Sequence, residues 1–96
     1  MHMNKKFRHI VIFKVFDTAN AGKVAEIVRQ LANATPNLLE NRVEISLDTR
    51  RGKFVVENFL FLSESDFIAF KASEVHGETV TLLRDICEWQ VVDYFE

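Results

Sequence analysis

The sequence contains a single cysteine, Cys87, so no disulfide bond can form within the chain. It has no apolar run near the ~20 residues that a membrane-spanning helix needs, and no secretory signal peptide is apparent. Three glycines and one proline are too few for a disordered or fibrous chain, and 48% of the residues are hydrophobic. We therefore expect a globular cytoplasmic protein.

Basic residues are not in excess, because the formal net charge is −2. The small basic group at Arg50, Arg51 and Lys53 is more typical of a solvated hairpin turn than of a phosphate site. Nucleic-acid binding needs a broad basic surface, so we expect no nucleic-acid partner. The 96 residues fit one domain, residues 1–96, and a chain of this size buries only roughly 60–65% of its unfolded surface.

The apolar pattern predicts the element order β-α-β-β-α-β. Strands are expected at residues 7–16, 41–50, 54–62 and 88–95, and helices after the capping segments 17–20 and 63–66 and over residues 76–86. Right-handed crossovers then give an α+β fold, a four-stranded antiparallel sheet of ferredoxin-like topology with its helices on one face. The first and third strands are central in that topology. Cys87 falls on the apolar stripe of the last helix, where a small buried residue is expected rather than a nucleophile.

Both central strands are apolar on their two faces. In the first strand, Ile10, Ile12 and Phe16 lie on the face opposite to that of His9. Exposure of several hundred Å² of such surface, at about 25 cal/mol per Å², costs many kcal/mol in a domain whose net stability is ~5–15 kcal/mol. We therefore predict a two-fold homodimer that pairs these sheet faces and forms a dimeric α+β barrel.

Three segments resemble the stress-responsive A/B barrel (Dabb) domain family: residues 8–14 (RHIVIFK), 69–76 (AFKASEVH) and 91–94 (VVDY). The resemblance extends from about Lys6 to Tyr94 and implies a dimeric barrel with a pocket between sheet and helices. Plant polyketide cyclases of this family close an aldol ring without a metal or organic cofactor. Their pocket is lined by a strand histidine, a tyrosine and a second histidine, which correspond here to His9, Phe70 and His76.

The chain departs from the family pattern at two places. Phe70 stands where the cyclases have tyrosine, so no phenol is available to orient a carbonyl. Ser73 and Glu74 replace a His-Pro pair, and we expect this replacement to loosen the break between the helices. Because of these two departures, the resemblance does not imply cyclase activity for this chain. It still implies the pocket between sheet and helices.

His9 and His76 are the candidate catalytic residues, as a pair that acts as general acid and base. A core histidine satisfied by its neighbours and a residue that caps a helix are the structural alternatives. The dipole of the helix that His76 opens is expected to favour its neutral ring. With no carboxylate or cysteine expected to face the two histidines, no metal site is predicted. The candidate ligand-binding residues are Val11, Phe13, Val28, Leu31 and Phe70.

The first functional hypothesis is a protein that binds an apolar small molecule and acts as a cofactor-free lyase or cyclase through enolisation. The second is a non-catalytic, stress-associated binding module in which the histidines are structural. The third is an oxygenase of the wider dimeric barrel group, such as an antibiotic-biosynthesis monooxygenase or a haem degrader; haem binding requires an axial ligand, which His76 could offer.

Overall fold

Four antiparallel strands form one sheet in the computed structural model, which describes residues 5–96. The strands are β1 (Phe7–Val15), β2 (Leu38–Ile45), β3 (Lys53–Phe61) and β4 (Cys87–Phe95). Their spatial order is β2-β3-β1-β4, so β1 and β3 are central and β2 and β4 are the edges. The predicted α+β fold of ferredoxin-like topology is confirmed.

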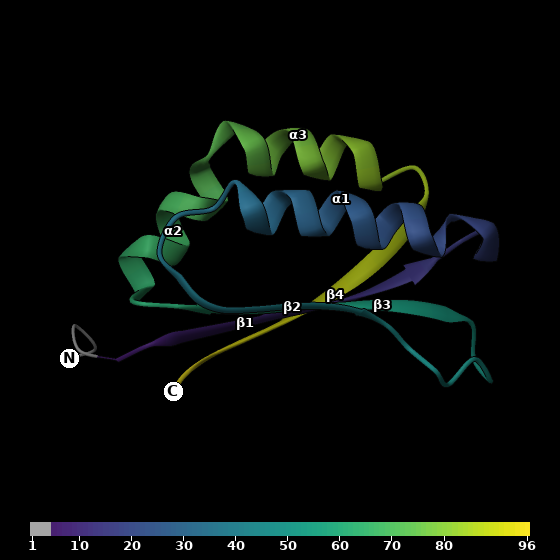
Figure 1. The fold of residues 1–96 in the computed structure, drawn as a ribbon, viewed down its shortest axis with the longest axis horizontal. Helices are drawn as coiled ribbons and strands as arrows, with labels where there is room; N and C mark the ends of the chain where they lie inside the picture. Colours follow the sequence, from purple (N-terminus) through teal and green to yellow (C-terminus); the bar gives the residue numbers. More distant parts are fainter. Residues whose placement is uncertain (1–4) are drawn as a thin grey trace.

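The helices lie on one face of this sheet, as predicted. They are α1 (Ala21–Asn33), α2 (Glu64–Ala72) and α3 (Glu74–Leu83), and a short 3-10 turn, η1 (Thr18–Asn20), precedes α1. Figure 1 shows α1 and α3 side by side above the sheet, with α2 at one end of it. None of the helices within residues 5–96 is both long and apolar enough to cross a membrane.

The hydrophobic core fills the space between the sheet and the helices. Alternate residues of β1, beginning with Phe7, point toward the helices and are buried. From α1, Val24 and Val28 are fully buried against this layer, together with Val55 and Phe59 of β3. Each such side chain contributes about 1.5–3 kcal/mol when it leaves water, which holds α1 against the sheet.

The other face of the sheet is covered by no element of residues 5–96 (Figure 1). Apolar side chains remain accessible there, because Ile12 is 41% exposed and Val92 is 49% exposed. These two residues lie on neighbouring strands, where Ile10 of β1 pairs with Val92 of β4. The face that carries this apolar surface is the one for which the sequence predicts a partner.

The second strand lies earlier in the chain than predicted, at residues 38–45 instead of 41–50. Asn37 has a left-handed backbone with φ of 63°, and this turn allows β2 to begin immediately after it. The hairpin loop is longer than expected, and in it Asp48 accepts a hydrogen bond from the backbone N–H of Arg50. Leu47, which the alternating pattern placed in the strand, is 99% exposed in this loop.

Cys87 is the first residue of β4 and does not lie on a helix, so that part of the prediction is wrong. The last helix ends at Leu83, three residues earlier than expected. The thiol of Cys87 is buried and donates a hydrogen bond to the carbonyl oxygen of Leu83 at 3.3 Å. Burial raises the pKa of the thiol to about 11, which is the behaviour of a packing residue and not of a nucleophile.

Candidate active site between the sheet and the helices

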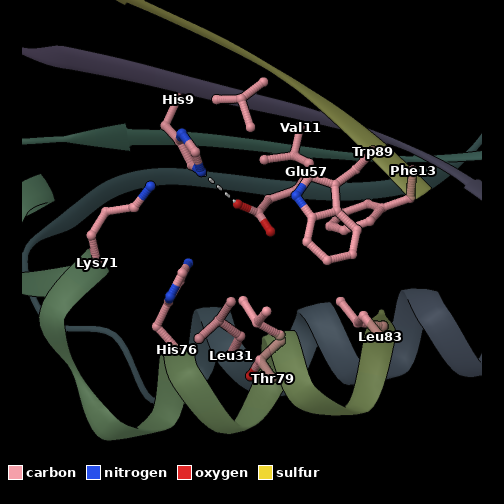
Figure 2. Close-up of a pocket in the computed structure, with 12 residues that line it drawn as sticks. His9, Val11, Phe13, Leu31, Glu57, Lys71, His76, Thr79, Leu83 and Trp89 are labelled. Atoms are coloured by element: carbon pink, nitrogen blue, oxygen red, sulfur yellow. Dashed lines mark ion pairs between the residues drawn. The ribbon is translucent and has the colours of Figure 1, made fainter. Parts of the chain in front are cut away.

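A cavity of about 220 Å³ lies between the sheet and the helices. It is lined by His9, Val11, Phe13, Leu31, Glu57, Lys71, His76, Thr79, Val80, Leu83, Trp89 and Val91. In Figure 2, the charged and imidazole side chains gather at one end of this space, and Trp89, Phe13 and Leu83 occupy the other end. The cavity therefore has a polar end and an apolar end, as pockets for small organic molecules commonly do.

Five of the seven residues singled out from the sequence line this cavity: His9, Val11, Phe13, Leu31 and His76. Val28 is not among the lining residues, because its side chain is fully buried in the core. Phe70 is also outside the lining. Its ring stands edge-on to His76, with centroids 4.8 Å apart, and lies 5.8 Å from the ring of His9. Phe70 therefore packs against the rings of both histidines without lining the cavity.

His9 is held between two carboxylates from the neighbouring strands. Its Nδ1 lies 2.5 Å from Oδ1 of Asp93 in β4, and its Nε2 lies 3.1 Å from Oε2 of Glu57 in β3. The side chains of His9 and Glu57 are each 4% exposed, whereas that of Asp93 is 32% exposed. The expectation that no carboxylate faces the histidines is wrong, and we call these three residues the His9 array.

The strand register explains how the array assembles. His9 pairs directly with Asp93 across β1 and β4, while Glu57 pairs with Val11, the next inward residue of β1. Sequence reasoning missed Glu57, although the signal was present: it occupies an inward position between Val55 and Phe59, where a charged residue needs a partner. The partner is His9.

Opposing influences act on the protonation of His9. Burial is the largest single influence and lowers its pKa, but the hydrogen bond and charge of Glu57, followed by those of Asp93, together outweigh it. The pKa of His9 is therefore raised above its ordinary value, which favours the imidazolium. With one carboxylate on each ring nitrogen, His9 has no free nitrogen to offer a bound molecule.

His76 has the opposite tendency. Burial lowers its pKa, and the positive charges of Lys71 and His9 lower it further, so the neutral ring is favoured. The sequence predicted the neutral form from the helix dipole; the direction agrees, and the causes are burial and neighbouring cations. The ring lines the cavity on the wall that faces the sheet (Figure 2).

Ser73 positions His76 by separating the two helices. Its backbone is extended, with φ of −71° and ψ of 149°, so α2 ends and α3 begins at this residue. The hydroxyl donates to the carbonyl oxygen of Phe70 at 2.7 Å and accepts from the backbone N–H of His76 at 3.2 Å. The break is therefore capped on both sides, and the expectation that Ser73 loosens it is wrong.

No group of three or more His, Cys, Asp or Glu residues within residues 5–96 is arranged to hold a metal ion. The His9 array contains three such residues, but the two carboxylates contact opposite nitrogens of the imidazole ring. The three side chains are therefore not directed at a common point, which a coordination site requires.

Solved structures with the same fold share little sequence with this chain. A hydroxynitrile lyase from Passiflora edulis is 20% identical, with a TM-score of 0.79 over 97% of this chain and 94% of the other. A dimeric ferredoxin-like protein of unknown function from Thermobifida fusca is 19% identical, with a TM-score of 0.79 over 100% and 95%. The cofactor-independent oxygenase SnoaB from Streptomyces nogalater is 13% identical, with a TM-score of 0.75 over 94% and 91%.

At these identities the structural similarity establishes the fold and not the activity. No curated protein sequence matches the chain. The family model for the stress responsive A/B barrel domain matches residues 7–96, which is nearly the whole chain. This protein therefore belongs to the stress responsive A/B barrel domain family, Dabb, as the three sequence segments indicated.

Proposed function

We propose that this protein is a homodimer that binds a small, largely apolar carbonyl compound in the cavity and promotes proton transfer on it without a cofactor, as a lyase or cyclase does. One observation carries the proposal: His9, Glu57 and His76 line the polar end of a cavity whose other end is lined by apolar side chains. Buried groups with shifted pKa values in a concave site are typical of acid–base catalysis.

The chemistry is enolisation of the bound compound. One group removes the proton α to the carbonyl, while a second polar group stabilises the negative charge that develops on oxygen. We propose that both requirements depend on His9 and His76. The apolar end, with Leu83 and Trp89, holds the hydrocarbon part and excludes water.

The homodimer is supported by the exposed sheet face and by the Thermobifida fusca protein of the same fold, which is described as dimeric. A second copy on this face leaves the cavity intact, because the helices lie on the opposite side of the sheet (Figure 1). The hydroxynitrile lyase and the cofactor-independent oxygenase indicate that this fold accommodates small-molecule chemistry.

The test is deuterium exchange at the α-carbon of small ketones, such as phenylacetone, in D₂O, followed by proton NMR. We expect saturable exchange that is faster than in buffer, and a loss of about 10²-fold or more in His9→Gln and His76→Gln. Glu78→Gln is the matched control, because Glu78 is an exposed residue of α3 that does not line the cavity. Exchange no faster than in buffer across a panel of small aryl and alkyl ketones contradicts the proposal.

A second candidate is a binding protein without catalysis. It is favoured by the observation that no buried side-chain nitrogen or oxygen within residues 5–96 lacks a hydrogen-bond partner, so His9 is satisfied as a structural histidine is. In this case His9→Gln lowers the free energy of unfolding by about 1–3 kcal/mol, because the buried carboxylate of Glu57 loses its partner, while the affinity for phenylacetone is unchanged. Thermal melts and a ligand titration distinguish the two candidates.

A further inference from the structure

We propose that Glu57 is the general base of the cavity and that His9 and Asp93 are positioning residues that hold its carboxylate toward the bound compound. This inference rests on the proposed function and assigns the proton-accepting atom within it. Sequence reasoning gave the histidines that role and did not consider Glu57.

Glu57 has a placement that a purely structural carboxylate does not need. Its side chain is 4% exposed, yet it lines the cavity. One carboxylate oxygen contacts Nε2 of His9, and Figure 2 shows the other oxygen directed into the space between the sheet and the helices. Among the lining residues Glu57 is the only one with a carboxylate.

The alternative bases in the cavity are less suitable. Both ring nitrogens of His9 are engaged, by Glu57 and by Asp93, so this ring reaches a bound compound only through Glu57. Burial of a carboxylate is costly unless a cation and hydrogen bonds compensate for it, and His9 supplies both. The contact with Nε2 of His9 therefore fixes the position of the Glu57 carboxylate, which is 4% exposed and lines the cavity.

The opposite wall supplies groups that suit the developing oxygen anion. Lys71 takes part in no ion pair within residues 5–96, and Figure 2 shows its side chain directed toward the cavity above His76. Lys71 and His76 both line the cavity, and Figure 2 shows them at the same end of it. A carbonyl oxygen near Lys71 and His76 leaves the adjacent carbon on the side of Glu57.

The proton-transfer step balances without another reactant. Glu57 accepts the α-proton and becomes a neutral carboxylic acid, and the C–H electron pair forms the C=C bond of an enolate. The negative charge moves to the oxygen beside Lys71 and His76. Glu57 then returns the proton to the product or to its leaving group, and the His9 array regains its initial charge.

The test uses 5-nitrobenzisoxazole, a small aromatic probe of general bases. A base removes the proton on its C3 while the N–O bond breaks, and the coloured 2-cyano-4-nitrophenolate forms. We expect saturable catalysis by the unaltered protein and a fall in kcat of about 10²-fold or more in Glu57→Gln, with KM nearly unchanged. Glu78→Gln, at an exposed position of α3 outside the cavity, is the control and keeps full kcat.

Asp93→Asn tests the positioning role through the pH profile. The titratable and cationic groups around His9 are Glu57 of β3, Asp93 of β4, His76 of α3 and Lys71 of α2. Without the charge of Asp93, His9 loses its proton at lower pH and Glu57 loses its cation. The high-pH limb of kcat then moves down by about one pH unit, which a loss of packing alone does not produce.

The outcomes separate this inference from the proposed function. Full kcat in Glu57→Gln, or no catalysis of the probe by the unaltered protein, overturns the role of Glu57. The ketone exchange experiment then decides the proposed function by itself. If Glu57→Gln fails to fold, Glu57→Asp replaces it: the shorter side chain keeps the charge but withdraws from the cavity, and an unchanged kcat also overturns the inference.

Discussion

His9 is the residue on which three strands converge, because its ring contacts Glu57 of β3 and Asp93 of β4 from its own position in β1. A histidine in an apolar strand drew attention in the sequence, and its partners did not. Each partner is far from His9 in the chain, so only the strand register brings the three side chains together. A pattern of alternating residues assigns faces, but it does not specify which residues of different strands are opposite one another.

The raised pKa of His9 makes the stability of the protein depend on pH. The folded state holds this proton more tightly than the unfolded chain, so the stabilisation is fully present below about pH 6.5 and is lost as the pH rises through the folded-state pKa. In a His76→Gln background, which removes a shift of opposite direction, we expect the free energy of unfolding to fall as the pH rises from about 6.5 through the folded-state pKa of His9, by at most about 1.4 kcal/mol per pH unit. Urea unfolding at a series of pH values measures it, and a rise over this range contradicts it.

Phe70 is the residue whose role differs most from the expectation. It packs against Phe59 and Phe61 as well as against both histidines and is 3% exposed. Phe70→Ala is expected to lower the free energy of unfolding by about 3–5 kcal/mol, because it removes a ring from a packed cluster. Ile68→Ala, at an exposed position of the same helix, is expected to change it by less than about 0.5 kcal/mol. Equal effects of the two substitutions in chemical denaturation contradict this role.

At the scale of elements, the helices and the central strands follow the sequence closely, because their apolar periodicity is strong. The edge strand β2 was misplaced, since its polar face and its flanking turns leave the ends poorly defined. The cap at Ser73 was also misjudged. The hydroxyl of Ser73 forms hydrogen bonds with backbone groups of both helices and so stabilises the break between them. In the family pattern, a His-Pro pair occupies the place of this break.

Ser73→Ala removes the cap at the break between α2 and α3. We expect it to lower the free energy of unfolding by about 0.5–2 kcal/mol and to shift the NMR signals of the His76 ring, because the first turn of α3 carries His76. Ser63→Ala is the matched control, since Ser63 caps α2 and does not contact α3. Destabilisation by both variants with a change of the His76 signals in Ser73→Ala alone is the expected result; unchanged His76 signals in Ser73→Ala contradict it.

Substitution of two glycines by alanine is expected to change the stability of the fold in opposite directions. Gly52 has φ of 126° in the hairpin loop, and a Cβ there would lie 3.2 Å from Cε of Lys14, so Gly52→Ala is expected to destabilise the fold by about 1–2 kcal/mol. Gly77 lies within α3 and a Cβ there meets nothing within 4 Å, so Gly77→Ala is expected to stabilise it by about 0.5–1 kcal/mol. Thermal melts of both variants check the signs.

At the scale of the whole molecule, the sheet divides two tasks between its faces. The face under the helices carries the core and the cavity, and the other face carries Ile12 and Val92 in contact with water. β1 and β3, the two strands that are apolar on both faces, are central in the sheet. Because the helices cover only one face, the sequence pattern predicted that a partner covers the other. A second copy on this face is the simplest cover, because a two-fold axis places like surface on like surface.

Sedimentation equilibrium at micromolar concentration tests this division of the sheet most directly. We expect the unaltered protein to sediment as two copies and Ile12→Glu to sediment as one, because the charge would be buried between the sheets. Ile68→Glu, at an exposed position of α2 on the helical side, is expected to remain dimeric. A folded single copy of the unaltered protein, or a dimer that survives Ile12→Glu and dissociates in Ile68→Glu, would contradict the pairing through the open face of the sheet.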